Sequence, residues 1–224
     1  MTMASKRAWA DVMVRRVRYT LAVIFLIRHG ETVGNAARIV QRPDSPLSPR
    51  GVAQAERLAR RLARAGVSRI LSSDLARART TAECLQRATG APLVFEPLLH
   101  ERNFGDIRGT SYSDLDFDMF APDYAPPNGE TWSVFHARVD RAWQRVQALA
   151  TVTDGNLAVV THGLVCRSVA SRFLELPAGA VVPERWENTS VTIVECPAPW
   201  RVTLLNCVAH LEDPDAAPAS SGVA

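Results

Sequence analysis

The hydrophobic pattern of the chain alternates between short apolar runs and segments with helical periodicity. Each apolar run is bounded by charged residues, glycine or proline, which is typical of strands buried on both faces. The expected strands are residues 21–27, 67–71, 92–95, 157–161, 190–195 and 202–206. The expected helices are residues 53–65, 74–89, 131–150 and 165–174. This alternation predicts an α/β fold, a three-layer α/β/α sandwich with a mainly parallel sheet.

Residues with capping chemistry mark the expected helix boundaries. Ser48 and Pro49 suit the N-cap and the first position of the first helix, and Gly66 suits its end. Asp74 is expected to open the second helix. From Thr131 onward, apolar residues recur at steps of three and four and are expected to face the core. They are Trp132, Phe135, Val139, Trp143, Val146 and Ala150.

Three regions depart from the alternation. Residues 96–129 contain four prolines and an acidic, aromatic stretch, which predicts loops with at most a short helix. Residues 211–224 are rich in Ala, Pro, Asp and Ser and too poor in apolar residues to fold, so a disordered tail is expected. Residues 1–20 form a basic N-terminal extension. A single domain is therefore expected over residues 21–210.

Charge and cysteine content narrow the class of protein. The formal net charge is +3, but residues 1–20 hold five basic side chains against Asp11, so the rest of the chain is close to neutral. Nucleic acid is therefore not expected as a partner. The apolar run at 21–27 is too short to span a bilayer, and no small-residue cleavage site follows it, so a secretory signal is not expected. A plain N-terminal extension or a start codon placed too early is the preferred interpretation of residues 1–20, with an organellar presequence or a surface helix as alternatives. Four well-separated cysteines without CxxC spacing favour a reducing cytoplasm.

Two of the expected strands end in a His-Gly pair. His29 follows the first strand in the run RHGET, and His162 follows the strand that ends in VVT and precedes Gly163. Because parallel strands point the same way, both histidines would emerge at one edge of the sheet, where open α/β sheets bind their ligands. A lone histidine at such a position is more often a capping or core residue. The pair makes a site the better interpretation.

Arginines accompany these histidines. Arg28 precedes His29, and Arg77 lies in the segment SSDLARARTTA, where another strand runs into a helix. Glu101 lies in the segment LHERNFGDIRG. The guanidinium fork suits phosphate oxygens, so arginines without a cluster of metal-binding carboxylates indicate an anionic ligand that side chains neutralise. Arg79 is two residues from Arg77 and points to another helix face, so it is expected in solvent.

Five motifs occur in an order that resembles the histidine phosphatase superfamily, in its phosphoglycerate mutase-like branch. The motifs are RHGETxxN at 28–35, SDLxRAxxTA at 73–82, LxExxFG at 99–105, PxGETxxxFxxRV at 127–139 and VTHG at 160–163. The resemblance covers roughly residues 21–207 and implies a phosphoglycerate mutase-like fold. It also implies a phosphohistidine mechanism.

The resemblance assigns roles to individual residues. His29 would attack phosphorus, and Glu101 would protonate the leaving group and then activate water. The residues expected to hold phosphate oxygens or to contact the substrate are Arg28, Arg77, His162, Asn35, Gly163 and Arg102. No metal and no cofactor is expected. Like-charge repulsion from the arginines should keep His29 neutral, and the same arginines should lower the pKa of Glu101 until substrate binds.

Three functions remain open at this point. The first is a metal-independent phosphomonoesterase for a small phosphorylated metabolite. The second is a cofactor-dependent phosphoglycerate mutase, because ERNFG resembles the mutase pattern ERxYG; the segment between Gly109 and Pro126 is short, however, and lacks the basic insertion of mutases. The third is a non-catalytic phospholigand-binding protein. Arg108 stands where many phosphatases of this branch carry an acid, and the oligomeric state, monomer or homodimer, is open.

Overall fold

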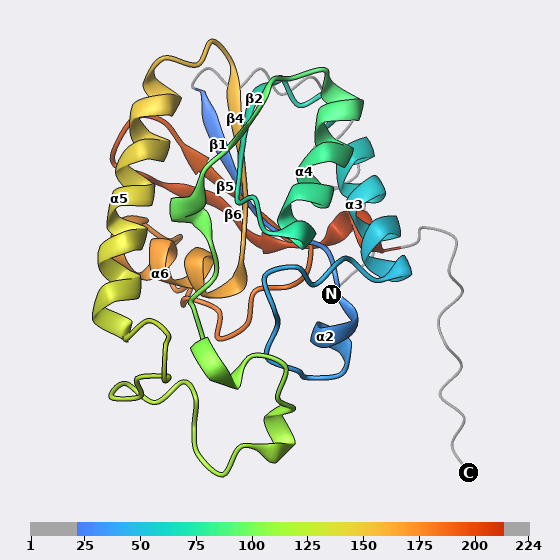
Figure 1. Ribbon diagram of the computed structural model, residues 1–224. Coiled ribbons are helices and arrows are strands. Elements are labelled where there is room, and N and C mark those ends of the chain that lie inside the picture. The colour runs from blue at the N-terminus through green and yellow to red at the C-terminus, as the bar shows by residue number, and fades with distance from the viewer. Residues whose placement is uncertain (1–21, 213–224) are drawn as a thin grey trace, which may run out of the picture.

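Strand β1, Val23–Arg28, is buried on both faces at the centre of the fold. The computed structural model describes residues 22–212 (Figure 1). Alternate side chains of β1 belong to two separate cores: Phe25 and Ile27 pack towards α3 and α4, whereas Ile24 and Leu26 pack towards α5 and α6. A strand covered by helices on both faces is apolar at successive positions, which is the pattern that predicted it.

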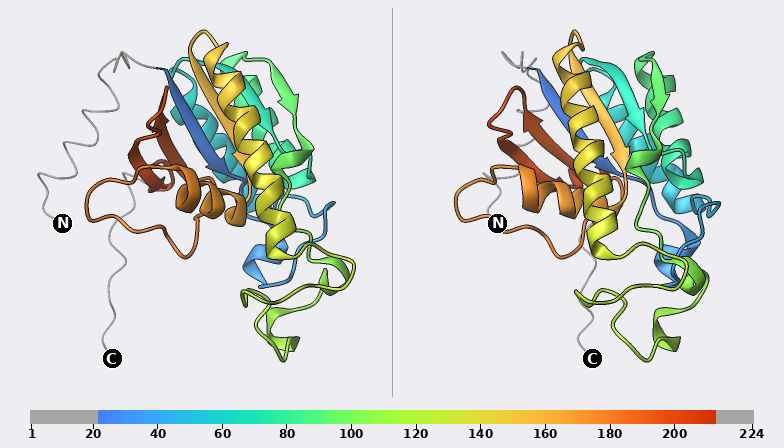
Figure 2. Two further views of the ribbon diagram at one scale, coloured as in Figure 1. Left: turned by 90° about the vertical axis from the view of Figure 1, so that its left-hand side faces the viewer. Right: turned by 60° about the vertical axis from the view of Figure 1, so that its left-hand side comes forward.

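The helices form two layers, one on each face of the sheet. Their bounds are α3 Pro49–Leu62 and α4 Ala76–Thr89 on one face, and α5 Trp132–Thr151 and α6 Gly163–Phe173 on the other. Figure 2 shows α5 in front of the sheet and α3 and α4 behind it. The apolar stripe of α5 faces the core, as predicted. The three-layer α/β/α sandwich is confirmed.

The six-stranded sheet has the order β3-β2-β4-β1-β5-β6. The remaining strands are β2 Val67–Ser72, β3 Leu93–Phe95, β4 Asn156–Thr161, β5 Val191–Glu195 and β6 Val202–Cys207. Strands β1 to β4 run parallel, and β5 runs antiparallel to both of its neighbours. The mainly parallel sheet is therefore confirmed. Arg28 of β1 pairs with Thr161 of β4, so the two His-Gly turns leave the sheet side by side.

Helix boundaries agree with the sequence except at the end of α3 and around Asp74: α3 ends at Leu62, and the predicted end at Gly66 falls in the turn that follows. Ser48 caps α3 by accepting a hydrogen bond from the Gly51 amide, with Pro49 at the first position. Helix α4 begins at Ala76, and its N-cap has no side-chain hydrogen bond. The prediction that Asp74 opens this helix was wrong, because its carboxylate pairs with the imidazole of His100 instead. A partner 26 residues away in the chain is invisible to a local capping pattern.

The irregular segment lies beyond the carboxyl edge of the sheet, near α2 Val33–Ala36 (Figure 1). It contains three short 3₁₀ helices, η1 Pro97–Leu99, η2 Gly105–Ile107 and η3 Tyr112–Asp114. A small core of Val40, Phe104 and Met119 holds it together. A further 3₁₀ helix, η4 Ala209–Leu211, packs against α3.

The basic extension expected at 1–20 lies outside the described residues, as does most of the tail expected at 211–224. Between residues 22 and 212, no helix is long and apolar enough to cross a membrane. The four cysteines are free thiols. Cys84 and Cys166 are buried, as small core residues are expected to be.

Candidate active site

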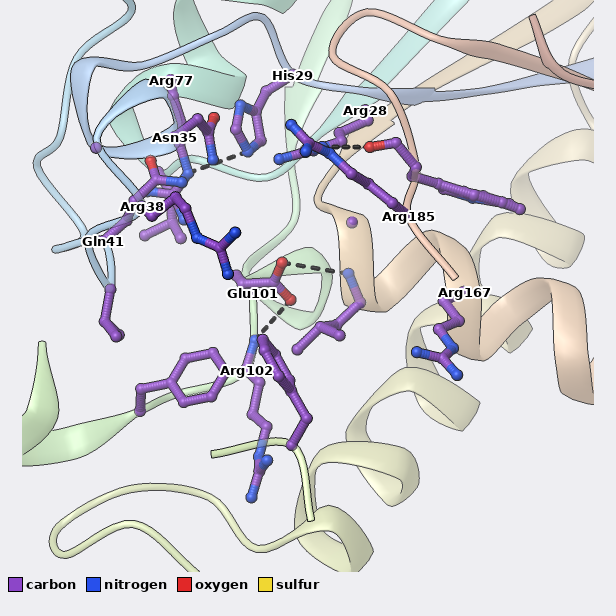
Figure 3. A pocket seen from close by; sticks show the side chains of 18 of the residues that line it. Arg28, His29, Asn35, Arg38, Gln41, Arg77, Glu101, Arg102, Arg167 and Arg185 are labelled. Atoms are coloured by element: carbon purple, nitrogen blue, oxygen red, sulfur yellow. Dashed lines mark hydrogen bonds between the residues drawn. The ribbon is translucent and has the colours of Figure 1, made fainter. Parts of the chain in front are cut away.

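His29 directly follows β1 and is almost fully buried, with 2% of its surface exposed. Its Nδ1 lies 2.7 Å from the carbonyl oxygen of Gly30. Since a carbonyl can only accept a hydrogen bond, Nδ1 carries the proton and Nε2 keeps a lone pair. Nε2 accepts a hydrogen bond from Nε of Arg77 at 3.3 Å (Figure 3). The imidazole is therefore held in one tautomer, with its nucleophilic nitrogen beside a cation.

The neutral form of His29 is strongly favoured. Burial is the largest cause that lowers its pKa well below the usual 6.5, and Arg77 and Arg28 lower it further. The hydrogen bond to Gly30 acts in the opposite direction. The sequence predicted the direction from the two arginines alone. The structure adds the larger cause, which is the removal of the imidazole from water.

The turn after His29 is closely packed against the start of α3. A Cβ on Gly30 would stand 2.6 Å from the carbonyl oxygen of Gly51, so only glycine fits there. The amide of Gly30 donates to the hydroxyl of Thr81. This N–H therefore fixes the turn and is not free for a ligand.

His162 and Arg28 lie beside His29. The ring centres of the two histidines are 5.1 Å apart, and Nε2 of His162 is 2.9 Å from the hydroxyl of Ser73. The guanidinium of Arg28 donates to the carbonyl of Trp186. Nδ1 of His162 and Nε of Arg28 are both buried without a hydrogen-bond partner in residues 22–212. Buried polar atoms are nearly always paired, so two unpaired ones next to His29 indicate the place of a polar ligand.

Arg77 is buried in the first turn of α4, 2% exposed. Its Nη1 donates to the carbonyl of Arg42 at 3.1 Å. Burial, helped by Arg28 and Arg108, lowers the pKa of Arg77 to about 10, so the guanidinium remains charged at neutral pH. Arg79 is exposed and lies over the ring of Phe95, in agreement with the sequence.

Glu101 faces the same pocket from the segment after η1 (Figure 3). Its Oε1 accepts from the amide of Arg102 at 2.9 Å, and its Oε2 accepts from the amide of Leu164 in the first turn of α6 at 3.3 Å. Burial raises the pKa of Glu101 above its usual value, although both amides and the nearby Arg77 and Arg28 act against this shift. The expectation of a lowered pKa was wrong, because the sequence displays the arginines but not the depth of the carboxyl group. A raised pKa suits a carboxyl group that donates a proton.

Asn35 and Gly163 also line the pocket. Oδ1 of Asn35 lies 3.3 Å from the amide nitrogen of Thr32 and 3.3 Å from Nδ2 of Asn188, and accepts from both. This leaves the amide N–H groups of Asn35 as donors towards the pocket. Gly163 is the first residue of α6, where backbone N–H groups attract anions.

The guanidinium of Arg102 is not brought to the site. It donates to the carbonyls of Glu130 at 3.0 Å, Tyr124 at 2.7 Å and Met119 at 3.4 Å, and lies over the ring of Trp132. Figure 3 shows it directed away from His29. The Arg102 guanidinium is therefore occupied by structural hydrogen bonds and is not placed for the predicted substrate contact. It ties the irregular segment to the body of the protein.

The pocket has a volume of about 330 Å³. We call its buried end the base, formed by Arg28, His29, Arg77 and Glu101 of the lining together with His162, which packs against His29. We call its outer end the mouth, formed by Arg38, Arg108, Arg167 and Arg185 with Tyr112. The sequence did not single out Arg38, Arg167 or Arg185, because they lie in no motif. Arg108 does not pair with Asp106 or Asp114, and in residues 22–212 no three potential metal ligands of the His, Cys, Asp or Glu type come together.

The fold and the base together define an α/β protein with a buried, arginine-flanked histidine at the carboxyl edge of its sheet. The family model of the histidine phosphatase superfamily (branch 1) matches residues 24–207, and the chain belongs to this family. It is 31% identical over 206 residues to the probable phosphoglycerate mutase GpmB of Erwinia tasmaniensis, covering 85% of this chain and 95% of that one.

Two solved structures show the same likeness. One is a putative alpha-ribazole-5'-P phosphatase of Escherichia coli K-12, with a TM-score of 0.74, 27% identity and coverage of 85% of this chain and 98% of the other. The second is a mycobacterial glucosyl-3-phosphoglycerate phosphatase in complex with VO3, with a TM-score of 0.71, 26% identity and coverage of 83% and 99%. Relatives named as mutases and as phosphatases therefore share this fold.

Proposed function

We propose that the chain is a metal-independent phosphomonoesterase that acts on a small phosphorylated metabolite through a phosphohistidine intermediate on His29. The observation that carries this proposal is the state of the His29 imidazole. Its Nδ1 is protonated and held by Gly30, and its unprotonated Nε2 lies 3.3 Å from the Arg77 guanidinium. The unpaired atoms of Arg28 and His162 support a phosphoryl group at the same place.

The first half of the reaction transfers the phosphoryl group to the protein. Nε2 of His29 forms a bond to phosphorus while the bond from phosphorus to the ester oxygen breaks. Glu101 gives its proton to the departing oxygen, which leaves as an alcohol. Arg28, Arg77 and His162 stabilise the charge on the phosphoryl oxygens.

The second half regenerates the enzyme. Water attacks phosphorus, the Glu101 carboxylate takes a proton from that water, and the bond between Nε2 and phosphorus breaks. The electron pair of that bond returns to His29, and inorganic phosphate leaves. Metal ions have no part in either half, and the four free thiols support a reducing cytoplasm as the setting.

Rapid-quench labelling tests the phosphohistidine. Incubation with a ³²P-labelled phosphomonoester in EDTA should give acid-labile, base-stable label on the wild-type protein and on His136→Ala, but none on His29→Ala. His136 is the control because it hydrogen-bonds Ser168 on the face of the sheet covered by α5 and α6, outside the pocket. If no phosphomonoester labels the wild-type protein, a non-catalytic binding role replaces the enzyme. Label that requires added metal would remove metal independence.

The mutase is the second candidate, favoured by the 31% identity to the probable phosphoglycerate mutase. The two activities differ in where the phosphoryl group goes after His29. With 3-phosphoglycerate and catalytic 2,3-bisphosphoglycerate, ³¹P NMR should detect inorganic phosphate as the main product. Accumulation of 2-phosphoglycerate without net phosphate release would replace the phosphatase by the mutase.

A further inference from the structure

Two arginines enter the pocket mouth from opposite sides. Arg38 comes from the loop after α2, and Arg185 comes from the segment before β5 (Figure 3). Both line the pocket, and neither guanidinium has a hydrogen bond or an ion pair with another residue in the described part of the chain. Several arginines elsewhere are paired with carboxylates, among them Arg50, Arg138, Arg145, Arg172 and Arg201. Unlike other arginines without a carboxylate partner, such as Arg60 on α3, Arg38 and Arg185 line one pocket.

The unpaired charge at the mouth exceeds what one phosphate needs. A phosphate dianion at the base already faces the two buried cations Arg28 and Arg77. Arg38 and Arg185 add two more positive charges, with Arg108 and Arg167 also in the pocket lining. The acidic side chains of the lining are Glu101 at the base and Glu184 beside Arg185. The pKa of Arg28 is lowered chiefly by burial, and Arg185 lowers it further, which places the two cations within electrostatic reach of each other. A negative group of the substrate next to Arg185 would reduce the repulsion between Arg185 and Arg28.

Arg38 is held in an unfavourable backbone conformation. Its φ is 54°, in the left-handed region that favours glycine and costs other residues about 1 kcal/mol. Its guanidinium lies 5.6 Å from the ring centre of Tyr112 on the opposite loop. Glycine would adopt this backbone conformation without strain but would carry no side chain. Arginine at this position instead puts a long cationic side chain at the mouth.

Arg185 is carried by a segment tied to the base. Nδ2 of Asn206 donates to the carbonyl of Arg185 at 3.1 Å. The next residue, Trp186, is 3% exposed, and its carbonyl accepts the guanidinium of Arg28. The backbone of Arg185 therefore keeps a fixed position relative to the phosphate-binding arginine.

We propose that Arg38 and Arg185 form a second anion subsite, which holds a carboxylate or a second phosphate of the substrate while the transferred phosphate lies at His29. The substrate class is then a small phosphorylated acid or a bisphosphate. The proposal rests on the phosphomonoesterase function for the identity of the group at His29. The subsite itself follows from the two unpaired cations in one pocket.

Calorimetry with non-hydrolysable phosphonates tests the subsite without turnover. The three matched ligands, each made with two to five methylenes, are an alkylphosphonate, its ω-carboxylate and its ω-phosphonate. At the best chain length, the ligand with one of the two charged tails should bind about tenfold more tightly than the alkylphosphonate of the same length. This ratio of affinities corresponds to the free energy of one charge-assisted hydrogen bond. The better of the two charged tails identifies the carboxylate or the second phosphate as the natural group.

Variants then assign the effect to the two arginines. Arg38→Gln and Arg185→Gln should each reduce the tenfold ratio to about twofold or less. Arg60→Gln removes the same charge from an exposed position on α3, outside the pocket, and should leave the ratio unchanged. An affinity ratio near one at every chain length would overturn the subsite. An equal loss of the ratio in Arg60→Gln would also overturn it, because the effect would then come from the overall positive charge of the protein.

Arg38→Gly separates binding from folding. Glycine accepts a φ of 54° without strain, so the thermal midpoint should stay or rise while the ratio is lost. A preserved ratio in Arg38→Gly would also count against the subsite. Binding of phosphonates requires no turnover, so the two proposals can fail separately. Tighter binding of a charged tail without any phosphohistidine would refute the phosphomonoesterase and keep the subsite. A phosphohistidine without tighter binding of a charged tail would refute the subsite and keep the phosphomonoesterase.

Discussion

The base and the mouth of the pocket are built from different kinds of structure. Side chains of the base come from the ends of β1 and β4, from the first turn of α4 and, for Glu101, from the segment after η1. His29, Arg77 and His162 are buried, and hydrogen bonds link the base to its surroundings. Arg38 and Arg185 at the mouth come from loops, are exposed, and their guanidinium groups have no hydrogen bond or ion pair within residues 22–212. A rigid base suits a fixed chemical step, whereas loops can vary the substrate without moving the nucleophile.

Removal of the Arg77 guanidinium should have the largest effect, because the base acts on the transition state. Arg77→Gln should lower kcat by about 10²- to 10³-fold and change KM much less, as for the loss of one preorganised donor. Arg79→Gln, two residues away and exposed, is the matched control and should keep kcat within about twofold. Steady-state kinetics on one phosphomonoester distinguish the two. A loss confined to KM would move Arg77 from the chemical step to binding.

Glu101→Gln tests the proton at the base. The raised pKa of Glu101 keeps the carboxyl group protonated to higher pH than usual, so phosphoenzyme formation should fall as pH rises through that pKa. Without this acid, the burst of alcohol release should slow about 10²-fold for an alkyl phosphate. The loss should be below about tenfold for p-nitrophenyl phosphate, whose leaving group needs no proton.

The matched control for Glu101 is Glu184→Gln, which removes an exposed acid from the wall of the same pocket. This variant should keep both burst rates. Equal losses for the alkyl and p-nitrophenyl esters in Glu101→Gln would mean that the side chain positions the substrate and does not deliver a proton.

The sequence predicted the base better than the mouth for a physical reason. His29 and His162 follow apolar runs that can only be buried strands, and strand direction brings their carboxyl ends to one edge. Arg38 and Arg185 are 147 positions apart and meet only because loops fold over that edge. No periodicity or local motif encodes such a meeting.

Burial was the other quantity that the sequence could not supply. The predicted pKa of Glu101 had the wrong direction, and that of His29 had the right direction from the smaller cause, because both depend on how deeply the groups lie. Arg102 shows the same limit, since its position next to Glu101 in the chain says nothing about which way the guanidinium points. Its partners at Met119, Tyr124 and Glu130 become visible only in the fold.

Arg102 lies next to Glu101 in the chain and ties down the irregular segment, so its loss should loosen that segment and spare the base. Arg102→Met leaves buried carbonyls unpaired and should lower the free energy of unfolding by about 2 kcal/mol in urea titrations. Hydrogen exchange should accelerate in residues 115–130, while vanadate affinity stays within about twofold. Arg141→Met, at an exposed site on α5, should change none of these. A large loss of vanadate affinity would restore the predicted substrate contact.

The smallest expected effect is on the pH dependence of the free energy of unfolding, which is reduced in acid because the histidines of the base are held neutral. Burial, with the neighbouring cations, lowers the pKa values of His29 and His162 well below 6.5. As pH falls below 6.5, the unfolded chain therefore takes up protons that the folded chain refuses, and stability is lost in acid.

Each of these two histidines should contribute up to about 1.4 kcal/mol of destabilisation per pH unit below 6.5. Urea titrations between pH 7.5 and 5 give the free energy of unfolding as a function of pH. This free energy should fall less steeply with decreasing pH in His29→Gln than in the wild-type protein, by the slope that uptake of one proton produces. His136→Gln is the control, because the pKa of that half-exposed histidine is lowered much less than that of His29, again chiefly by burial. An unchanged slope in His29→Gln would mean that the folded protein protonates His29 as readily as the unfolded chain does, so that burial and the arginines do not hold it neutral.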